Sequence, residues 1–399
     1  MGKRQLKGLQ IANQKQVRKT NDGWFVKSQS ASGFYKVDEL FNCNCPDAQF
    51  HKATCKHAFA VRFYLKTEID TPNGKIVAEK RVTYSQNWKA YDKSQQEEKT
   101  RFLELLSDLC LTVQEPTYAF GRPKASQRDL LFASALKVYS QFSLRRFMSD
   151  LQTAKEKKLV SSMPCFASVG HFMQKPELTL ILQELITLSA LPLKSVETNF
   201  AVDSSGFRTT KFNDYCTQAH GLARAHKFLK AHVLCGVKTN IICSATITEE
   251  NGADSPQFAP LVETTASNGF QMLEVTADKA YSSRDNYEAV KEVGGIAFIP
   301  FKSNATGKTR GSLLWRKMFH YFQFNQDEFL QHYHKRSNVE TTFSMIKAKF
   351  NDLLKSKTTT AQINECLLKI LCHNIVVIIH ETNELGINPN FGVESKQTV

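Results

Sequence analysis

The chain has 399 residues, of which 42% are hydrophobic and 23% are charged. This composition is typical of globular proteins and excludes a disordered, collagen-like or coiled-coil chain, while the length predicts roughly two or three domains. Lys and Arg exceed Asp and Glu, which gives a formal net charge of +14. A basic excess of this size predicts an anionic partner, for which nucleic acid is the commonest candidate.

The first ten residues, MGKRQLKGLQ, are charged and lack the apolar segment of a signal peptide. No run of about 18 consecutive apolar residues is found, so no segment is expected to cross a membrane. The apolar residues 375–379 are expected to lie in a short buried helix. The ten cysteines are interpreted as reduced thiols or metal ligands rather than as a disulfide framework, and the expected compartment is the cytoplasm.

Half of the net positive charge lies in residues 1–65, which contain eleven Lys and Arg and four Asp and Glu. Within this segment, residues 24–27 and 34–37 predict a short β-hairpin, and residues 58–66 predict a helix. The segment is therefore expected to form a small module of its own.

Four potential metal ligands lie between this hairpin and this helix: Cys43, Cys45, Cys55 and His57. Residues i and i+2 of a strand face the same way, and three thiolates with one imidazole make a closed tetrahedral set for structural Zn²⁺. The order of hairpin, C-x-C, C-x-H and helix resembles the SWIM zinc finger, which implies that residues 1–66 bind DNA or another protein. The alternative is a small core that contains cysteines by chance, and His51 is a spare ligand. The other cysteines have apolar surroundings and are expected in the core: Cys110, Cys165, Cys216, Cys235, Cys243, Cys366 and Cys372.

Residues 67–125 are expected to form a linker followed by a helix. The first part is polar and contains Pro72-Asn73-Gly74, a turn signal, whereas helical periodicity returns at residues 100–111. Gly121-Arg122-Pro123 resembles the core of an AT-hook, in which Arg122 would enter the DNA minor groove. A plain linker turn is the favoured interpretation, because Phe120 stands where the hook has an arginine.

Residues 126–196 show helical periodicity and are expected to form a helical DNA-binding domain, with helix starts at Ser143 and Pro176. Strands then alternate with helices over residues 197–385, which predicts an α/β domain with a mixed sheet. Residues 386–399 are expected to form a tail. The predicted strands are residues 199–203, 239–248, 270–277 and 296–301, and the predicted helix starts are Ser255 and Ser282.

Three carboxylates are distinguished by their positions. Asp203 and Asp278 each end a predicted strand, and Glu340 lies in a helical segment. Carboxylates that meet at one sheet edge raise each other's pKa unless a cation neutralises them, and their oxygens suit Mg²⁺ or Mn²⁺. Two such ions can activate the attacking oxygen and stabilise the leaving oxygen of a phosphodiester. The three residues are therefore candidate catalytic metal ligands.

The helical segment around Glu340 carries a second pattern. If it forms one helix, Tyr333, Arg336, Glu340 and Lys347 project within an arc of about 60°. The adjoining face is apolar and would pack on a sheet, so the polar face would present a carboxylate, two cations and a phenol to a phosphate backbone. His332 and His334 are interpreted as solvated helix residues rather than as metal ligands.

These residues resemble the Y-x2-R-x3-E-x6-K signature of DDE transposases from prokaryotic insertion sequences, and Asp203 and Asp278 resemble the other two acids of that triad. The resemblance implies an RNase H-like catalytic domain, divalent metal at Asp203, Asp278 and Glu340, and DNA contacts from the other three residues of the signature. The segment between Asp278 and Glu340 is too short for the large β-domain that some members insert there.

The resemblance also implies a function. A DDE transposase binds the ends of its own element, cleaves DNA with divalent metal and joins the 3′-OH ends to target DNA. We expect the protein to act on DNA as a homodimer and to associate with the nucleoid. Two alternatives remain: a non-catalytic DNA-binding protein derived from a transposase, and a structure-specific nuclease without strand transfer. Strand-transfer products would separate the nuclease from the transposase.

Overall fold

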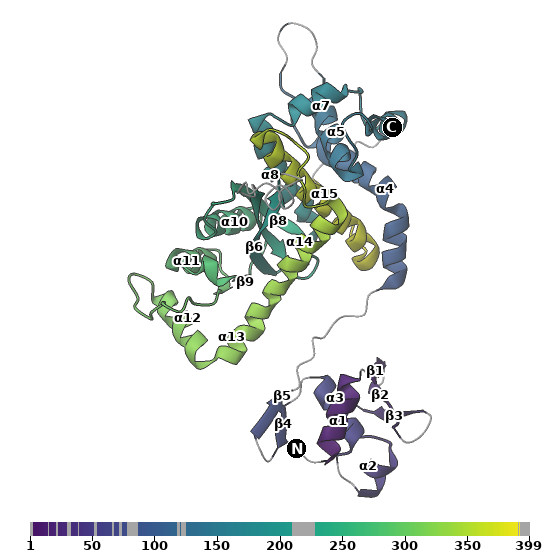
Figure 1. Ribbon diagram of the computed structural model, residues 1–399, viewed down its shortest axis with the longest axis vertical. Helices are drawn as coiled ribbons and strands as arrows, with labels where there is room; N and C mark the ends of the chain where they lie inside the picture. Colours follow the sequence, from purple (N-terminus) through teal and green to yellow (C-terminus); the bar gives the residue numbers. More distant parts are fainter. Residues whose placement is uncertain are drawn as a thin grey trace, which may run out of the picture. The chain divides into compact units, whose positions relative to one another are not determined.

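The computed structural model divides the chain into two compact units, Met1–Gln86 and Asn87–Val399, which are described separately (Figure 1). The structure describes residues 3–14, 16–20, 23–29, 33–38, 40–51, 54–65, 68–71, 74–77, 87–117, 120, 125–209, 228–389 and 391.

The first unit combines small antiparallel sheets with short helices. Its described elements are α1 (Lys3–Asn13), β1 (Val17–Thr20), β2 (Gly23–Lys27), β3 (Phe34–Val37), α2 (Pro46–His51), α3 (Lys56–Tyr64), β4 (Glu68–Thr71) and β5 (Gly74–Val77). Strands β1, β2 and β3 form one sheet in that order, so the predicted hairpin of β2 and β3 is confirmed. Helix α1 packs closely on α3. A Cβ added at Gly8 would lie only 2.7 Å from Phe59 Cβ, so the absence of a side chain at Gly8 permits this approach.

The segment expected as a linker after residue 66 contains structure. Strands β4 and β5 pair antiparallel, with Thr71 opposite Gly74. Helix α4 (Trp88–Leu111) begins earlier than predicted, where the side chain of Asn87 accepts a hydrogen bond from the Ala90 N–H. The part expected as a polar linker thus contains a strand pair, because the same turn residues occur between paired strands as in linkers, and the helix expected after it is present as α4.

The second unit begins with helices, as predicted for residues 126–196. After α4 come α5 (Gln127–Ser140), α6 (Met148–Glu156), α7 (Phe166–Phe172), α8 (Pro176–Ala190) and the 3₁₀ turn η1 (Leu191–Leu193). Pro176 is the first residue of α8, as expected, whereas α6 begins at Met148, after a turn in which Ser143 Oγ accepts from the Arg146 N–H.

A five-stranded mixed sheet follows, which confirms the predicted α/β class. Its strands are β6 (Asn199–Arg208), β7 (Phe228–Gly236), β8 (Ile242–Glu249), β9 (Glu274–Ala277) and β10 (Ile296–Phe298), in the spatial order β10-β9-β6-β7-β8. Strand β6 pairs antiparallel with β7 and parallel with β9. Strand β7 was not predicted, because it is buried over most of its length and so lacks the alternation of a half-exposed strand.

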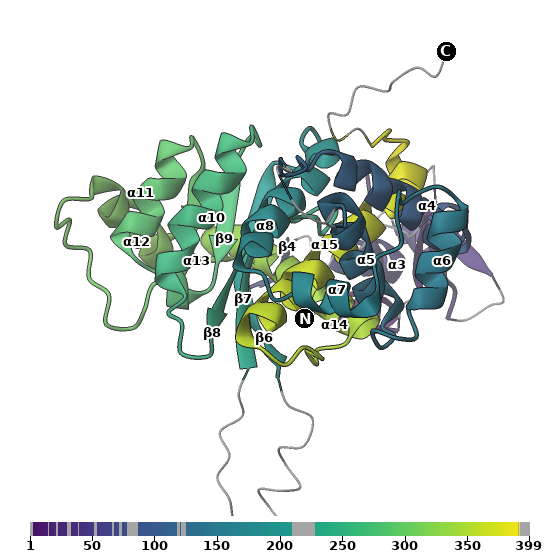
Figure 2. The same ribbon diagram turned by 90° about the horizontal axis from the view of Figure 1, so that it is seen from above.

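Helices cover both faces of this sheet (Figure 2). Helices α10 (Ser255–Ser267) and α11 (Arg284–Glu292) lie on one side, and α8, α14 (Ser337–Phe350) and α15 (Thr359–Leu385) lie on the other. The remaining elements are η2 (Lys279–Tyr281), α12 (Leu313–Phe324), α13 (Gln326–Tyr333) and η3 (His334–Arg336). The start of α11 is capped by Ser283 rather than by the predicted Ser282, since Ser283 Oγ accepts from the Asn286 N–H.

Helix α15 joins the helical block to the sheet. It contacts α4, α5, α8 and β8, so the helices and the sheet share one hydrophobic core. The side chain of Asn374 accepts from the Ile242 N–H at 2.9 Å and donates to the Ile242 carbonyl at 2.7 Å, which ties α15 to β8.

Helix α15 is also much longer than the short buried helix expected around residues 375–379. By length and mean hydropathy it is apolar enough to cross a membrane, but 89% of its apolar window is buried inside the unit. Polar residues such as Lys369, His373 and Asn374 interrupt the apolar run, so the sequence has no 18 consecutive apolar residues here although the mean hydropathy is high. The expectation that no segment crosses a membrane stays a prediction.

Buried His373 on α15 predicts a pH-dependent stability. Its Nε2 lies 3.0 Å from the Asn240 carbonyl oxygen, and burial lowers its pKa to about 4. In the unfolded chain this histidine is protonated below about pH 6.5, whereas in the folded protein it stays neutral down to about pH 4. The free energy of unfolding should therefore fall as the pH is lowered from about 6.5 to about 4, by about 2 kcal/mol at pH 5. Urea unfolding at pH 7 and pH 5 measures this.

The His373→Gln variant is the matched comparison, because glutamine can still donate to the carbonyl but does not titrate. It should lose less stability than the unmodified protein between pH 7 and pH 5. An equal loss in both proteins would show that His373 does not contribute to the pH dependence.

Candidate active site and candidate zinc site

Asp203 and Asp278 are brought together by the sheet. Strands β6 and β9 are parallel neighbours, and Val202 pairs with Ala277. The residues that follow this pair are Asp203, within β6, and Asp278, just after β9, so both lie at the same level of adjacent strands. Asp203 is partly buried and accepts a hydrogen bond from the Ser204 N–H at 2.8 Å.

Glu340 reaches the same region from α14, which packs on β6. The guanidinium of Arg336 connects the acids: its Nη1 lies 2.6 Å from Asp203 Oδ2, and its Nη2 is paired with Glu340 Oε1. Burial raises the pKa of Asp203, although the Ser204 N–H and the Arg336 charge oppose this rise, and the nearby Asp278 and Glu340 add to it. Arg336 therefore neutralises a group of carboxylates that repel one another.

The other two residues of the signature also face this region. The Arg336 guanidinium lies 5.9 Å from the centre of the Tyr333 ring. Lys347 Nζ donates to Ser205 Oγ at 2.7 Å. Because residues i and i+2 of a strand share a face, Ser205 and Asp203 lie on the same side of β6. The arrangement thus places a phenol and two cations beside the acids.

The path of the chain differs from the single helix assumed in the sequence analysis. Helix α13 ends at Tyr333, η3 follows, and α14 begins at Ser337. This turn is held against the sheet, because His332 Nδ1 and Lys335 Nζ lie 3.0 Å and 2.6 Å from the carboxylate oxygens of Glu274 on β9. His332 also stacks on Phe298, so the expectation that it is a solvated residue was wrong.

Sequence reasoning missed a polar group on the opposite side of β6. Asp254, just before α10, accepts from Ser204 Oγ at 2.9 Å and pairs with Lys230 Nζ at 2.6 Å. Buried His232 lies on β7 with Nδ1 3.4 Å from Asp254. No sequence motif predicts this group, because its members come from three separate segments of the chain.

The donor atoms at the acidic site are of the chemical kind that suits a divalent cation. Carboxylate oxygens are the donors that Mg²⁺ and Mn²⁺ prefer. The site also already stabilises a positive charge, since the Arg336 guanidinium is held between Asp203 and Glu340.

The second candidate site lies in the first unit. The ligand atoms of Cys43, Cys45, Cys55 and His57 all lie within 4.8 Å of one another, and all four residues are buried. His57 Nδ1 is 3.9 Å from both Cys43 Sγ and Cys55 Sγ. A tetrahedral Zn²⁺ with bonds of about 2.0–2.3 Å separates its ligand atoms by about 3.3–3.8 Å, so the four side chains fit this ion with little movement.

Local structure positions these ligands. Cys43 follows β3 and forms an isolated bridge with Val37, while Cys55 caps the start of α3 and His57 lies in its first turn. The thiol of Cys43 donates a hydrogen bond to Cys55. This bond, together with hydrogen bonds from His57 and the Ala58 N–H, lowers the pKa of Cys55 to about 4. The same hydrogen bond, together with burial, raises the pKa of Cys43. A metal would replace this shared proton and favour the thiolate form of all three cysteines.

The remaining predictions have mixed outcomes. Cys110, Cys235, Cys243, Cys366 and Cys372 are buried as expected, but Cys165 is exposed at the start of α7. Arg122 and Cys216 lie outside the described residues, so both the favoured linker turn and the AT-hook alternative at Arg122 stay predictions.

Comparison with protein families addresses the acidic site directly. Residues 194–375 match the family model described as the transposase DDE domain. The matched segment includes Asp203, Asp278, Glu340 and the three other residues of the signature, together with the whole mixed sheet.

Other comparisons add less. No curated protein matches the chain. A piggyBac transposase synaptic complex with hairpin DNA, solved by cryo-electron microscopy, is similar at 9% sequence identity and a TM-score of 0.34, covering 73% of this chain and 74% of that chain.

Proposed function

We propose that the protein is a transposase of a prokaryotic insertion sequence, which binds the ends of its element, cleaves DNA with divalent metal and joins the 3′-OH ends to target DNA. The observation that carries the proposal is the DDE domain match over residues 194–375, within which Asp203 and Asp278 lie on neighbouring strands and Arg336 links Asp203 to Glu340.

Asp203, Asp278 and Glu340 would hold the divalent metal, Mg²⁺ or Mn²⁺, and act as the catalytic triad. When bound, the metal supplies a Lewis acid that activates water and stabilises the leaving oxygen of the phosphodiester. The protein positions these acids through the pairing of β6 with β9 and the packing of α14 on β6.

Tyr333, Arg336 and Lys347 would contact the DNA backbone. Arg336 is paired with two carboxylates in this structure, and it becomes available to a phosphate once their charge is balanced in another way. Burial lowers the pKa of Lys347, which lies beside Ser205 and 5.4 Å from the Phe207 ring centre. A phosphate at this position would favour the charged lysine.

The first unit would serve as a zinc module of the SWIM type, with Zn²⁺ held by Cys43, Cys45, Cys55 and His57. Its role would be to bind DNA or a second protein chain rather than to catalyse. The helical segment of residues 126–196 would add to DNA binding, and the active assembly would be a homodimer on DNA, associated with the nucleoid in the cytoplasm.

The proposal is tested with the DNA that flanks the gene. Short inverted repeats should lie close to both ends, and a plasmid carrying them should be cut by the purified protein with Mg²⁺, giving 3′-OH ends and strand-transfer products. Cleavage without joining would identify a nuclease instead. Binding without any cleavage would identify a non-catalytic DNA-binding protein.

Removing the two cations should weaken the hold on DNA at the active site. Arg336→Ala and Lys347→Ala are each expected to reduce the slope of log affinity against log salt concentration by about one unit, because each phosphate contact releases about one counterion. Fluorescence anisotropy on end-containing DNA at several salt concentrations measures the slope. If both variants keep the original slope, neither side chain contacts a phosphate in the complex.

A further inference from the structure

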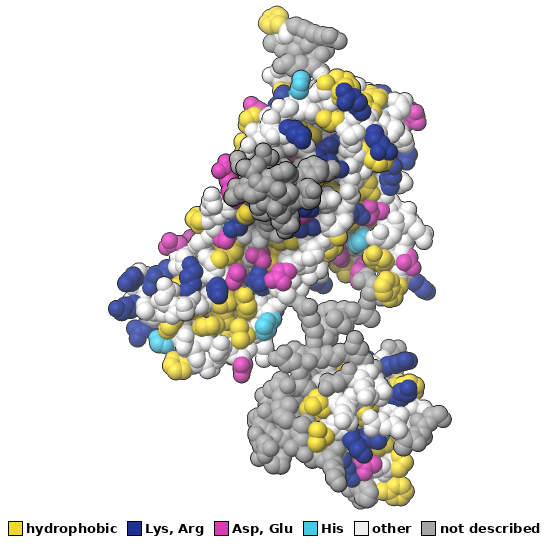
Figure 3. All heavy atoms as spheres, in the orientation of Figure 1, with side chains coloured by type: hydrophobic (Ala, Val, Ile, Leu, Met, Phe, Trp, Pro, Cys, Tyr) yellow, Lys and Arg dark blue, Asp and Glu magenta, His cyan; other side chains and the backbone are white. Residues whose placement is uncertain are grey.

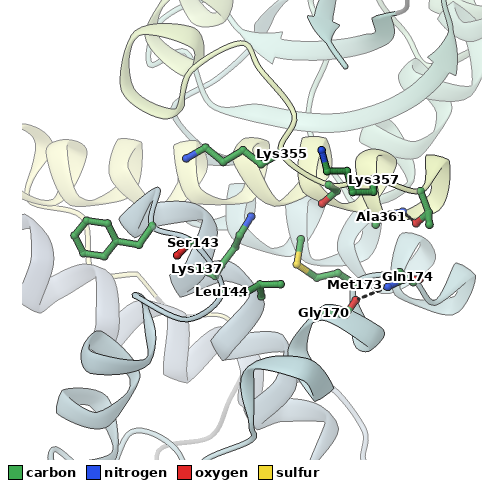
Figure 4. A pocket seen from close by; sticks show the side chains of 12 residues that line it. Lys137, Ser143, Leu144, Gly170, Met173, Gln174, Lys355, Lys357 and Ala361 are labelled. Carbon is green, nitrogen blue, oxygen red and sulfur yellow. Dashed lines mark hydrogen bonds between the residues drawn. The ribbon is translucent and has the colours of Figure 1, made fainter. Parts of the chain in front are cut away.

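A cavity of about 320 Å³ lies in the second unit, away from the acidic residues (Figure 4). It is bounded by the end of α5 and the turn after it, by the end of α7, and by the segment that leads into α15. Three lysines line it, Lys137, Lys355 and Lys357, and the twelve described lining residues include no Asp or Glu. The cavity is therefore strongly cationic.

The charge of Lys137 is held inside the structure. The residue is only 6% exposed, and its ammonium group points toward Lys355 and Lys357 (Figure 4). The nearest carboxylate, Glu365 Oε1, is 3.9 Å away, which is too long for a hydrogen bond. Glu365 instead accepts hydrogen bonds from the backbone N–H groups of Lys355 and Ser356, at 3.0 Å and 2.8 Å. Lys137 is thus a buried cation that lines the cavity and makes only a loose ion pair with Glu365.

The rest of the lining suits a phosphate attached to a sugar. Helix α15 starts at this cavity, where Thr358 caps it, and the N–H groups of a helix's first turn attract anions. Ser143 and Ser356 add hydroxyl groups, while Leu144 and Met173 provide an apolar wall.

The rim extends this cationic character over the surface. Phe142 is 41% exposed, with the Arg146 guanidinium 5.3 Å from its ring centre, and Phe166 is 37% exposed, with Arg145 at 4.8 Å. Figure 3 shows Lys and Arg side chains gathered with hydrophobic ones over α5 and α7. Basic residues interleaved with exposed aromatic rings are typical of surfaces that follow a nucleic-acid strand.

We propose that this cavity binds a backbone phosphate of DNA, at a second contact point outside the catalytic site. The inference rests on the proposed function, because it takes DNA as the ligand. DNA is favoured over a free phosphate ion because the aromatic and arginine rim would continue the contact along a strand, whereas a free ion would need only the cavity.

The test uses the full-length protein and a fluorescein-labelled duplex of random sequence. The double variant Lys355→Ala with Lys357→Ala removes two exposed ammonium groups from the cavity. It should bind the duplex about tenfold more weakly and lower the salt slope by about one unit, because hydrogen bonds to charged groups and counterion release are both lost. Lys157→Ala is the matched control, since it removes an exposed lysine of the same helical block that does not line the cavity.

Hydrogen exchange on the unmodified protein locates the contact, and DNA should protect residues 355–361. Unchanged affinity and slope in the double variant, or an equal loss in Lys157→Ala, would overturn the cavity assignment. Titration with inorganic phosphate alone separates the sources of phosphate: micromolar binding that the double variant lacks would show that the cavity takes a free ion instead of DNA.

The two proposals fail in distinguishable ways. The transposase proposal fails if the unmodified protein with Mg²⁺ gives no cleavage or strand transfer on the flanking DNA. The cavity proposal is decided by the binding of random-sequence duplex, which needs neither metal nor the element's ends.

Discussion

Asp203→Asn is expected to abolish both DNA cleavage and strand transfer, with a loss of roughly 10³-fold or more. Asparagine has nearly the same shape, and its side-chain oxygen can still accept from the Ser204 N–H. What it removes is the negative charge that pairs with Arg336 and that would hold a divalent metal. The fold should therefore persist while catalysis is lost. Strand-transfer assays with Mg²⁺ on end-containing DNA measure the effect, and circular dichroism checks the fold.

Asp278→Asn and Glu340→Gln should have the same effect, since the two-metal mechanism needs all three charges. The matched control is Asp285→Asn, which removes a carboxylate from the exposed first turn of α11 and should keep its activity. Full activity in any one of the three triad variants would remove that residue from the triad. An equal loss of activity in the Asp285→Asn control would mean that the loss in the triad variants reflects reduced protein stability or the changed net charge rather than the loss of a metal ligand.

Cys55→Ser is expected to abolish zinc binding and to unfold the first unit while the second unit stays folded. Serine is itself a good helix cap, so the variant can still accept from the Ala58 N–H and removes chiefly the metal ligand. Small zinc modules depend on the metal for folding, with apparent binding energies of about 10–16 kcal/mol. Zinc content by mass spectrometry and hydrogen exchange of residues 1–86 measure the two effects.

The same variant tests the role of this unit. Its affinity for DNA or for a partner chain should fall, while strand transfer should remain measurable at high protein concentration. Glu340→Gln should do the reverse and bind normally without cutting. Cys165→Ser, which changes an exposed thiol of the second unit, is the matched control and should keep its zinc. Unchanged zinc content in Cys55→Ser would refute the zinc site, and normal affinity without catalysis would show that the unit has another role.

The sequence by itself predicted the features that depend on neighbouring residues. Alternation and turn residues identified the hairpin of β2 and β3, and Pro176 marked the start of α8. The candidate zinc ligands were also predictable from the sequence, because all four lie within fifteen residues and their spacing reflects the local geometry of a strand end and a helix start. The acids were identified by their places in predicted strands and helices, and their metal-binding role remains a prediction.

Tertiary structure decided the features that depend on distant residues. Strand β7 was not predicted because both of its faces are covered. Helix α15 is a core helix because it packs against α4, α5, α8 and β8. The bridge from Arg336 to Asp203 spans 133 positions of sequence, and the cavity joins Lys137 to Lys355 and Lys357. The charge and hydropathy patterns of the sequence indicate which residues can be buried or paired. Only the packing of the sheet and its helices determines which of them meet, because contact energies between distant segments leave no periodicity in the sequence.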